Sequence, residues 1–493
     1  MQTTLKNYGT SLLLFVLTTF SLGAAPNTPN VVLLLADDMG FGDLGANNPK
    51  SKIPTPNLDR LAKEGTRFTD AHSSSGVCTP SRYALLHGRY HWRKFHQIVR
   101  SFDQPILDAD RLTLASLLKI KGYATACIGK WHLGWDWNAI KKPGAVNVPK
   151  KGYAPDAFDW SKPIPGGPLS HGFDYYFGDD VPNFPPYAWF ENDRVITPPT
   201  VSVEPPDKPL EGHWEARPGP AVKDWDFFAV MPKLTEKAEQ WIRGRDRGKP
   251  FFLYVPFTSP HAPIVPAKEF SGRSQAGAFG DYVVQTDDAV GRILNALKET
   301  GAEENTIVIF SSDNGAEVYA YDRIRNFEHF SSGEFRGVKR DLWEGGHHVP
   351  LLVRWPGTVP SGRVSDGLVS QIDIYATLAS ALGLPIPKNS AEDSIDQLSL
   401  WTGGEGRRTA LVHNTNANHY ALRSGDWLLV DAPTGAISKV PAWFDERFGY
   451  KKNTQKGELY NLQDDHSQKK NLFDQNPQKV SELQTLLHQI SGR

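Results

Sequence analysis

The stretch NVVLLLADDMG, residues 30–40, carries the pattern that decides the fold. An uninterrupted apolar run is followed directly by two aspartates. A run of this kind without polar alternation is typical of a strand buried on both faces, as in a parallel sheet covered by helices. Helical patterns alternate with such runs along the chain, so the sequence predicts an α/β protein with a large, mostly parallel sheet between helices.

Three further apolar runs also end in polar side chains: residues 123–134 (YATACIGKWHLG), 250–263 (PFFLYVPFTSPHAP) and 305–315 (NTIVIFSSDNG). In open α/β sheets, ligands bind outside the carboxyl ends of the strands. We therefore expect the polar residues after the four runs to meet at one edge of the sheet. They are Asp37, Asp38, Lys130, His132, His261, Asp313 and Asn314.

The acidic and amide side chains of this set indicate a metal site. Asp37, Asp38, Asp313 and Asn314 offer oxygen ligands, which suit calcium or magnesium better than zinc. Each residue taken singly has a plainer explanation, because Asp and Asn often close turns after strands. The occurrence of two such pairs is what favours a metal.

One of the two cysteines lies in VCTPSRYALLHGRY, residues 77–90. Thr79 can cap a helix here, and Pro80 suits its first turn, so Cys78 is predicted at the helix N-terminus near Arg82. A cysteine in such a place is typically an activated thiolate. Because soft sulfur does not suit a hard cation, the combination suggests that this sulfur is not retained in the mature protein.

The bulk properties limit the class of protein. A chain of 493 residues suits a large domain and a smaller one. The formal net charge of -1 provides no whole-chain field for nucleic acid or an anionic membrane. With only two cysteines, at most one disulfide is possible, and Cys127 lies in a predicted buried strand, where it behaves as a small hydrophobe.

The first 25 residues have the character of a secretory signal peptide. Lys6 precedes the apolar run at residues 11–23, which is too short to span a bilayer, and small residues follow up to Ala25. The alternative is an uncleaved anchor. The prediction is a protein exported to the periplasm or the medium, with no membrane span after cleavage.

CTPSR at residues 78–82 resembles the C-x-P-S-R signature of the type I sulfatases, in the alkaline phosphatase superfamily. The resemblance continues in the family's order through most of residues 29–360, and more weakly in ALRSGDWLLV and GELYNLQDD of the C-terminal part. The supporting motifs are ADDMGFGDLG, TPNLDRLAKEGTRFTDAH, GKWHLG, HGFDYYFG, SPHAP, SSDNG and RGVKRDLWEGG.

The resemblance implies a mechanism. Cys78 would be oxidised to Cα-formylglycine by a formylglycine-generating or anaerobic sulfatase-maturating enzyme. One hydroxyl of the hydrated aldehyde, activated by calcium, attacks the sulfur of a sulfate ester, and the other then expels sulfate. The calcium ligands implied are Asp37, Asp38, Asp313, Asn314 and the modified residue 78.

Roles for the other polar residues follow from the same resemblance. Arg82, Lys130 and Lys339 would neutralise the sulfate as its charge redistributes. His261 is the candidate general acid for the leaving alcohol, and His132 would assist the diol, although these two roles could be exchanged. His72 and His347 are expected to be structural.

The sequence departs from the family pattern at three positions. His87 stands where threonine is usual in L-T-G-R, His348 where arginine is common, and Ala376 where proline is frequent. None is a core catalytic position, so we expect them to affect local packing or subsite detail.

The expected organisation is a catalytic domain over residues 26–405 and a C-terminal α+β subdomain over residues 406–493, with a short antiparallel sheet and a closing helix near residues 476–490. The Pro-rich segment 178–220 is predicted to be an irregular loop that forms a pocket wall. Its aromatics could flank a sugar or simply pin the loop to the body; they are Phe184, Tyr187, Trp189 and Trp214.

The expected substrate is a sulfated saccharide of the galactose or N-acetylgalactosamine type. Asp179, Asp180 and His413, the last within HNTNANHY at residues 413–420, are the candidates to bond its hydroxyls. Two alternatives stay open: a phosphodiesterase or phosphonate monoester hydrolase on the same fold, and a non-catalytic carbohydrate-binding homologue.

Overall fold

The computed structural model describes residues 28–204, 209–212 and 214–492. The predicted signal peptide, residues 1–25, lies outside these ranges. Among the described residues, no helix combines the length and apolar character needed to cross a membrane.

Strand β1 (Asn30–Ala36) is the centre of the molecule. Its side chains alternate between two cores: Val31 and Leu33 contribute to one, and Val32 and Leu34 to the other. Because both faces of the strand are covered, its sequence is apolar throughout rather than alternating. This confirms the reading of residues 30–40.

The large sheet has ten strands in the order β13-β2-β12-β11-β1-β10-β4-β5-β6-β7. The central five, β11 to β5, are parallel, which confirms the predicted core of the sheet. At both sides the sheet becomes mixed, since β12 and β6 run antiparallel to their inner neighbours. The strands other than β1 are β2 (Thr66–Phe68), β4 (Ala124–Lys130), β5 (Tyr175–Asp180), β6 (Phe190–Glu191), β7 (Arg194–Val195), β10 (Phe251–Pro256), β11 (Thr306–Ser312), β12 (Leu351–Arg354) and β13 (Arg363–Ser365).

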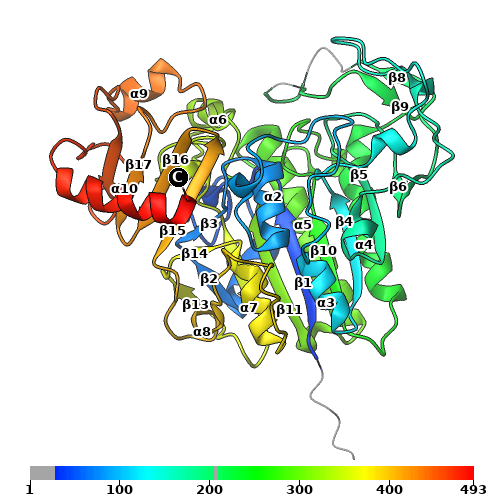
Figure 1. Cartoon of the computed structure of the whole chain (residues 1–493), viewed down its shortest axis with the longest axis horizontal. Helices are drawn as coiled ribbons and strands as arrows, with labels where there is room; N and C mark the ends of the chain where they lie inside the picture. The colour runs from blue at the N-terminus through cyan, green and yellow to red at the C-terminus, as the bar shows by residue number, and fades with distance from the viewer. Residues whose placement is uncertain (1–27, 205–208, 213, 493) are drawn as a thin grey trace, which may run out of the picture.

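Helices cover both faces of this sheet (Figure 1). Four contribute their apolar side chains to the core that contains Val31: α2 (Cys78–His87), α3 (Leu114–Ile120), α7 (Asp373–Ala381) and α8 (Leu398–Trp401). Three others pack into the opposite core: α1 (Pro56–Glu64), α4 (Val230–Gly244) and α5 (Gly277–Glu299). The predicted three-layer α/β architecture is therefore present.

The Pro-rich segment 178–220 is more ordered than predicted. It holds the hairpin β6–β7, which extends the large sheet, and the pair β8 (Val201–Val203) and β9 (Gly219–Ala221). Antiparallel strands need only short turns, so these pieces fit into a segment whose composition indicated a loop. Tyr187 and Trp214 are buried in the core, and so pin the segment to the body.

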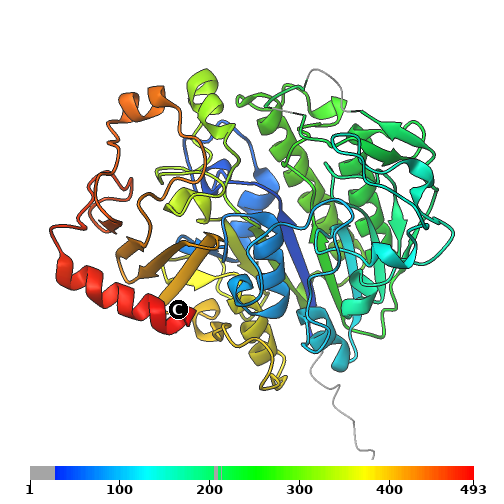
Figure 2. The ribbon, with the colours of Figure 1, turned by 45° about the horizontal axis from the view of Figure 1, so that its top comes forward.

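The C-terminal region forms a four-stranded antiparallel sheet, β15-β16-β17-β18, beside the large sheet (Figure 2). Its strands are β15 (Ala410–Asn416), β16 (His419–Ser424), β17 (Trp427–Val430) and β18 (Glu458–Asn461). The remaining elements are β3 (Ala71–His72), paired with β14 (Val369–Ser370), and the helices α6 (Ala320–Phe327), α9 (Ala442–Phe448) and α10 (Pro477–Ser491). Helix α10 confirms the predicted closing helix.

Candidate active site

The carboxyl ends of β1 and β11 bring the two acidic pairs together. The strands are parallel neighbours with Ala36 opposite Ser312, so the residues that follow each strand are adjacent. The Nδ2 of Asn314 donates to Asp38 Oδ1 at 2.7 Å, and the backbone N–H of Asp38 donates to Asp313 Oδ1 at 3.2 Å. Asp38 adopts a left-handed backbone with φ 67°, which is uncommon outside glycine and frequent at functional sites.

Three buried cations pair with the three carboxylates. Lys130 Nζ lies 2.5 Å from Asp37 Oδ2, and Lys339 Nζ lies 2.6 Å from Asp38 Oδ1. The Arg82 guanidinium lies 2.8 Å from Asp313 Oδ2. These six side chains come from five segments of the chain, and their formal charges cancel.

Two effects set the pKa values of the carboxylates in this cluster: burial, and the charges of the neighbouring groups. Burial alone would raise the pKa of Asp38, but Lys339 and His261 outweigh it and hold that pKa below its usual range. Burial, followed by the charge of Asp37, raises the pKa of Asp313 to about 6. The two carboxylates therefore differ because one has a close lysine and the other faces a second carboxylate.

Helix α2 begins at Cys78, two residues earlier than a Thr79 cap would place it. Val77 is the N-cap residue, so the prediction that Thr79 caps the helix is wrong. The Thr79 hydroxyl instead donates to the carbonyl of His132 at 3.1 Å and accepts from the N–H of Val99 at 3.2 Å. Thr79 thus ties the start of α2 to the segment after β4.

Cys78 is buried among these charges, with 4% of its surface exposed. Burial raises the pKa of its thiol, and the charges of Lys130 and Lys339 only partly oppose this. Burial therefore favours the neutral thiol over the thiolate at this position. Both cysteines are free thiols, and Cys127 lies buried in β4 as predicted.

The two candidate catalytic histidines have different surroundings. His261 Nε2 lies 3.7 Å from Asp38 Oδ2, and burial, then Lys339, lowers the pKa of His261 to about 4. His132 is held by a 2.9 Å contact between its Nε2 and the carbonyl of Val99. Burial, then Lys130, lowers the pKa of His132 well below its usual value, and its buried Nδ1 has no hydrogen-bond partner.

The four side chains predicted to bind calcium fit that role. Two oxygens of the set, Asp37 Oδ1 and Asn314 Oδ1, are buried and make no hydrogen bond. Orphaned buried oxygens are costly unless a cation or water satisfies them, and a calcium ion prefers carboxylate and amide oxygens. Asp37 and Asp38 also have oxygens that lie close enough to share one ion.

The residues predicted to contact a sugar come from two strands, Asp179 and Asp180 from the end of β5 and His413 from β15. Asp180 accepts from the N–H of His132 at 3.3 Å and so supports the segment that carries His132. Asp179 is buried, its oxygens make no hydrogen bond, and burial raises its pKa to about 7. His413 lies in β15, stacked on His347 with ring centroids 3.3 Å apart. Direct contact of these three with a sugar stays a prediction.

Sequence reasoning missed Glu317 and Gln371. Glu317 lies 3.6 Å from Lys339 and is also paired with Arg340, so Lys339 has a second carboxylate partner besides Asp38. Gln371 donates from Nε2 to the hydroxyl of Ser311 at 2.7 Å and accepts from Ser81 at 3.3 Å, which links β11 to α2. Neither follows a long strand, so strand ends gave no signal for them.

The three departures from the family pattern have structural roles. His87 accepts from the N–H of Asp108 at 3.3 Å, and His348 contacts Glu344 at 3.0 Å and the carbonyl of Thr69 at 2.7 Å. The N–H of Ala376 donates to Ser394 at 2.9 Å, a bond that a proline at this position would abolish.

A groove of about 820 Å³ begins next to His132. The Phe184 ring lies 5.7 Å from the His132 ring and forms part of the groove wall. Three exposed cationic side chains and one exposed carboxylate also line it: Arg100, Lys150, Arg217 and Asp103.

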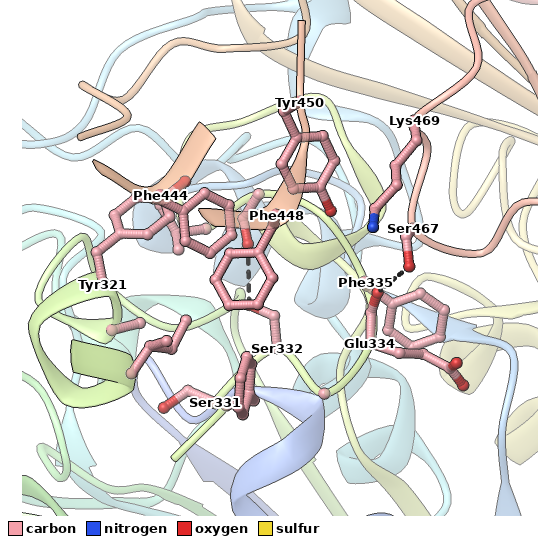
Figure 3. A pocket seen from close by; sticks show the side chains of 16 residues that line it. Tyr321, Ser331, Ser332, Glu334, Phe335, Phe444, Phe448, Tyr450, Ser467 and Lys469 are labelled. Carbon is pink, nitrogen blue, oxygen red and sulfur yellow. Dashed lines mark hydrogen bonds between the residues drawn. The ribbon is translucent and has the colours of Figure 1, made fainter. Parts of the chain in front are cut away.

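A second, smaller pocket of about 140 Å³ lies away from this site (Figure 3). It is lined by α6, the loop after it and the C-terminal region, with the aromatic rings of Tyr321, Phe444 and Phe448 among its walls. Ser467 donates to the carbonyl of Glu334 across it at 3.3 Å. None of the predicted catalytic or metal-binding residues lines this pocket.

Comparison with known proteins defines the class. Residues 29–384 match the family model named Sulfatase. The chain is 33% identical to an N-acetylgalactosamine-6-O-sulfatase of Bacteroides thetaiotaomicron, over 96% of this chain and 94% of that one. It is 35% identical to the N-acetylgalactosamine-6-sulfatase of Canis lupus familiaris (80% and 70% covered) and 30% identical to the human steryl-sulfatase (84% and 76%).

The solved structures agree. A structure described under the metabolism of multiple glycosaminoglycans by Bacteroides thetaiotaomicron superposes with a TM-score of 0.78 and 30% identity, covering 95% of this chain and all of that chain. A phosphonate monoester hydrolase of Agrobacterium radiobacter shares the fold at a TM-score of 0.59 and 19% identity, covering 93% and 95%. The chain belongs to the sulfatase family, and it is a sulfuric ester hydrolase.

Proposed function

We propose that this protein removes sulfate from a sulfated saccharide, with 6-sulfated N-acetylgalactosamine as the first candidate. The observation that carries the proposal is the buried ring of three carboxylates and three cations around Cys78. The N-acetylgalactosamine-6-sulfatases among the relatives supply the sugar. Because a steryl-sulfatase is also among the relatives, the identity of the alcohol is tested directly.

Asp37, Asp38, Asp313 and Asn314 would hold a calcium ion. The charge balance supports this, because three carboxylates against three cations leave no excess positive charge to bind an anionic ester. A divalent cation would supply the missing charge and polarise a sulfate oxygen.

Residue 78 would act after conversion to formylglycine. The hydrated aldehyde would supply one hydroxyl as the nucleophile and a second that lets sulfate leave. This maturation requires a formylglycine-generating or anaerobic sulfatase-maturating enzyme as a partner. Together with export and removal of residues 1–25, it belongs to the proposal.

The surrounding residues orient the ester and move protons. Lys130, Lys339 and Arg82 hold positive charge next to residue 78, where they can stabilise the sulfate oxygens. His261 would protonate the leaving alcohol, and the negative charge of a bound ester would raise its low pKa toward the useful range. His132, fixed by Val99, would accept a proton from residue 78.

The groove next to His132 supports a saccharide substrate. Its cations Arg100, Lys150 and Arg217 exceed its single carboxylate, Asp103, so it suits a chain that carries further anionic groups. Phe184, with Arg217 over its ring at 4.7 Å, closes the end of the groove nearest His132. We assign the remainder of the saccharide to this groove.

The proposal is tested by comparing esters of one alcohol on protein matured in a host that forms formylglycine. Sulfate release from 6-sulfated N-acetylgalactosamine should far exceed phosphate or phosphonate release from matched esters. Preferential cleavage of the phosphonate would favour the alternative hydrolase. An aldehyde-bearing protein that binds the sugar without turnover would be a non-catalytic homologue.

A further inference from the structure

Three histidines from distant parts of the chain meet in one buried cluster outside the candidate active site. His72 ends β3, His347 follows the EGG turn at residues 344–346, and His413 lies in β15. Each is essentially inaccessible to solvent, and each offers a ring nitrogen within 4.8 Å of the other two.

The hydrogen bonds of two of these rings fix their tautomers. His72 Nε2 lies 2.7 Å from Asp70 Oδ1, and His347 Nε2 lies 3.2 Å from the carbonyl of Leu342. A carboxylate and a carbonyl only accept, so both Nε2 atoms carry the proton. In the neutral rings, Nδ1 is then the atom with the free lone pair.

These two Nδ1 atoms face each other at 3.1 Å. Two lone pairs at that distance repel unless a positive centre lies between them. Two nitrogens bound about 2.0–2.1 Å from one tetrahedral zinc ion stand about 3.3 Å apart, close to the separation observed. The bonds from Nε2 to Asp70 and Leu342 are of the kind that orients histidine ligands.

His413 completes the set. It is 1% exposed, and neither of its ring nitrogens has a hydrogen-bond partner. An unsatisfied buried polar atom costs about 1–3 kcal/mol, so this ring lacks a partner that a metal ion would provide. One ring nitrogen of His413 lies within 4.8 Å of a nitrogen of His72 and of His347. Because its ring is stacked on that of His347, it would turn out of the stack to share the ion.

The charges around the cluster favour a cation. Asp70 and Glu344 face it with two negative charges, and Arg423 with one positive charge. His348 is also in contact, through its ring nitrogen 3.0 Å from Glu344.

We propose that His72, His347 and His413 form a binding site for a divalent transition metal ion of the zinc type. Nitrogen ligands suit zinc, whereas the oxygen ligands of the active site suit calcium, so the two sites would take different ions. The metal would tie β3, the turn before His347 and β15 together. The cluster also contacts the loop that leads to Cys78. The N–H of Ser73 donates to the His347 carbonyl at 2.9 Å, and the hydroxyl of Ser75 donates to the Asn414 carbonyl at 2.8 Å.

The test is metal titration of the full-length mature protein. Protein stripped with a chelator and resupplied with calcium is titrated with zinc, and separately with cobalt as a spectroscopic probe. We expect one equivalent of zinc to bind and to raise the melting temperature, and cobalt to give the visible bands of a tetrahedral histidine site. His413→Phe keeps a ring against His347 but removes the ligand. It should weaken zinc binding by about 100-fold or more, beyond the roughly 10–100-fold lost when a residue that only orients a ligand is removed.

The exposed His488 provides the matched control, and His488→Gln should bind zinc as the wild type does. The proposal is overturned if wild-type protein binds no more zinc than His413→Phe, or if cobalt gives no such bands. If the wild type binds no zinc, the metal site is excluded whatever effect His413→Phe has on saccharide turnover. The outcome is independent of the proposed sulfatase activity.

Discussion

His261 is the residue whose proposed role has the sharpest kinetic signature. If it protonates the leaving alcohol, its loss matters for a sugar alcohol and hardly for a nitrophenol, which leaves without protonation. His261→Ala should therefore lower turnover of the saccharide sulfate by about 10²–10⁴-fold and that of nitrophenyl sulfate far less. The measurement is kcat/KM for both esters.

His132→Ala is the matched control for that experiment. Because His132 is assigned to residue 78 and not to the alcohol, its loss should depress both substrates in similar proportion. If His132→Ala lowered kcat/KM for the saccharide sulfate alone, and His261→Ala lowered kcat/KM for both esters equally, the roles of the two histidines would be the reverse of those proposed.

Cys78→Ala tests the nucleophile. Turnover should be abolished, while the sugar still binds and the melting temperature changes little, because the metal ligands and the cations remain in place. Circular dichroism and calorimetric titration with the sulfated sugar check both parts. Loss of the fold would show that residue 78 has a structural role instead.

At this scale, the sequence identified the residues that follow strands, because parallel strands deliver their carboxyl ends to one edge. Glu317 and Gln371 were not predicted, because their positions depend on loops, and the path of a loop leaves no hydrophobic periodicity in the sequence. His413 was predicted to contact a sugar, but its burial against His347 comes from the packing of β15, which the local pattern does not indicate.

Among the elements, helix α1 depends on a neighbour for its N-terminal cap. Its own Thr55 makes no side-chain cap, and Asp287 of α5 accepts from the N–H groups of Asn57 at 3.1 Å and Leu58 at 2.8 Å. Asp287→Asn replaces one acceptor oxygen by a donor and should lower the free energy of unfolding by about 1–3 kcal/mol. Chemical denaturation measures this.

The neighbouring Asp288 is the control, because its side chain is partly exposed. Asp288→Asn should change the unfolding free energy by less than about 0.5 kcal/mol. Equal effects of the two substitutions would mean that the cap contributes nothing specific.

The elements themselves were predictable where the pattern was long. The apolar runs before Asp37, Lys130, His261 and Asp313 became β1, β4, β10 and β11. The strands of the Pro-rich segment could not be predicted, because strands of two or three residues such as β6 and β9 leave no periodicity to detect. The start of α2 was misplaced because Thr79 bonds the His132 segment instead of its own helix.

In the whole molecule, the C-terminal region is part of the structure that holds the active site. Ala84 of α2 shares a core with Val412 and Leu422 of the small sheet. Ser438 donates to the carbonyl of Lys339 at 2.6 Å. A chain ended at residue 405, the predicted domain boundary, should therefore lose activity and melt at a lower temperature than the full chain.

Thermal denaturation and sulfate release measure that effect, with a chain ended at residue 474, which removes α10 alone, as the comparison. The shorter deletion should be less damaging, because it leaves the small sheet and Ser438 in place. A fully active chain ended at 405 would show that residues 26–405 form an independent domain.

The central claim is that residue 78 acts as formylglycine in a sulfatase. Peptide mass spectrometry of enzymatically active protein from its native host tests it most directly, by reading the mass of the residue in the peptide that contains CTPSR. We predict an aldehyde at position 78 in the active protein and intact cysteine in inactive, unmatured protein. Active protein in which Cys78 keeps its sulfur would contradict the account.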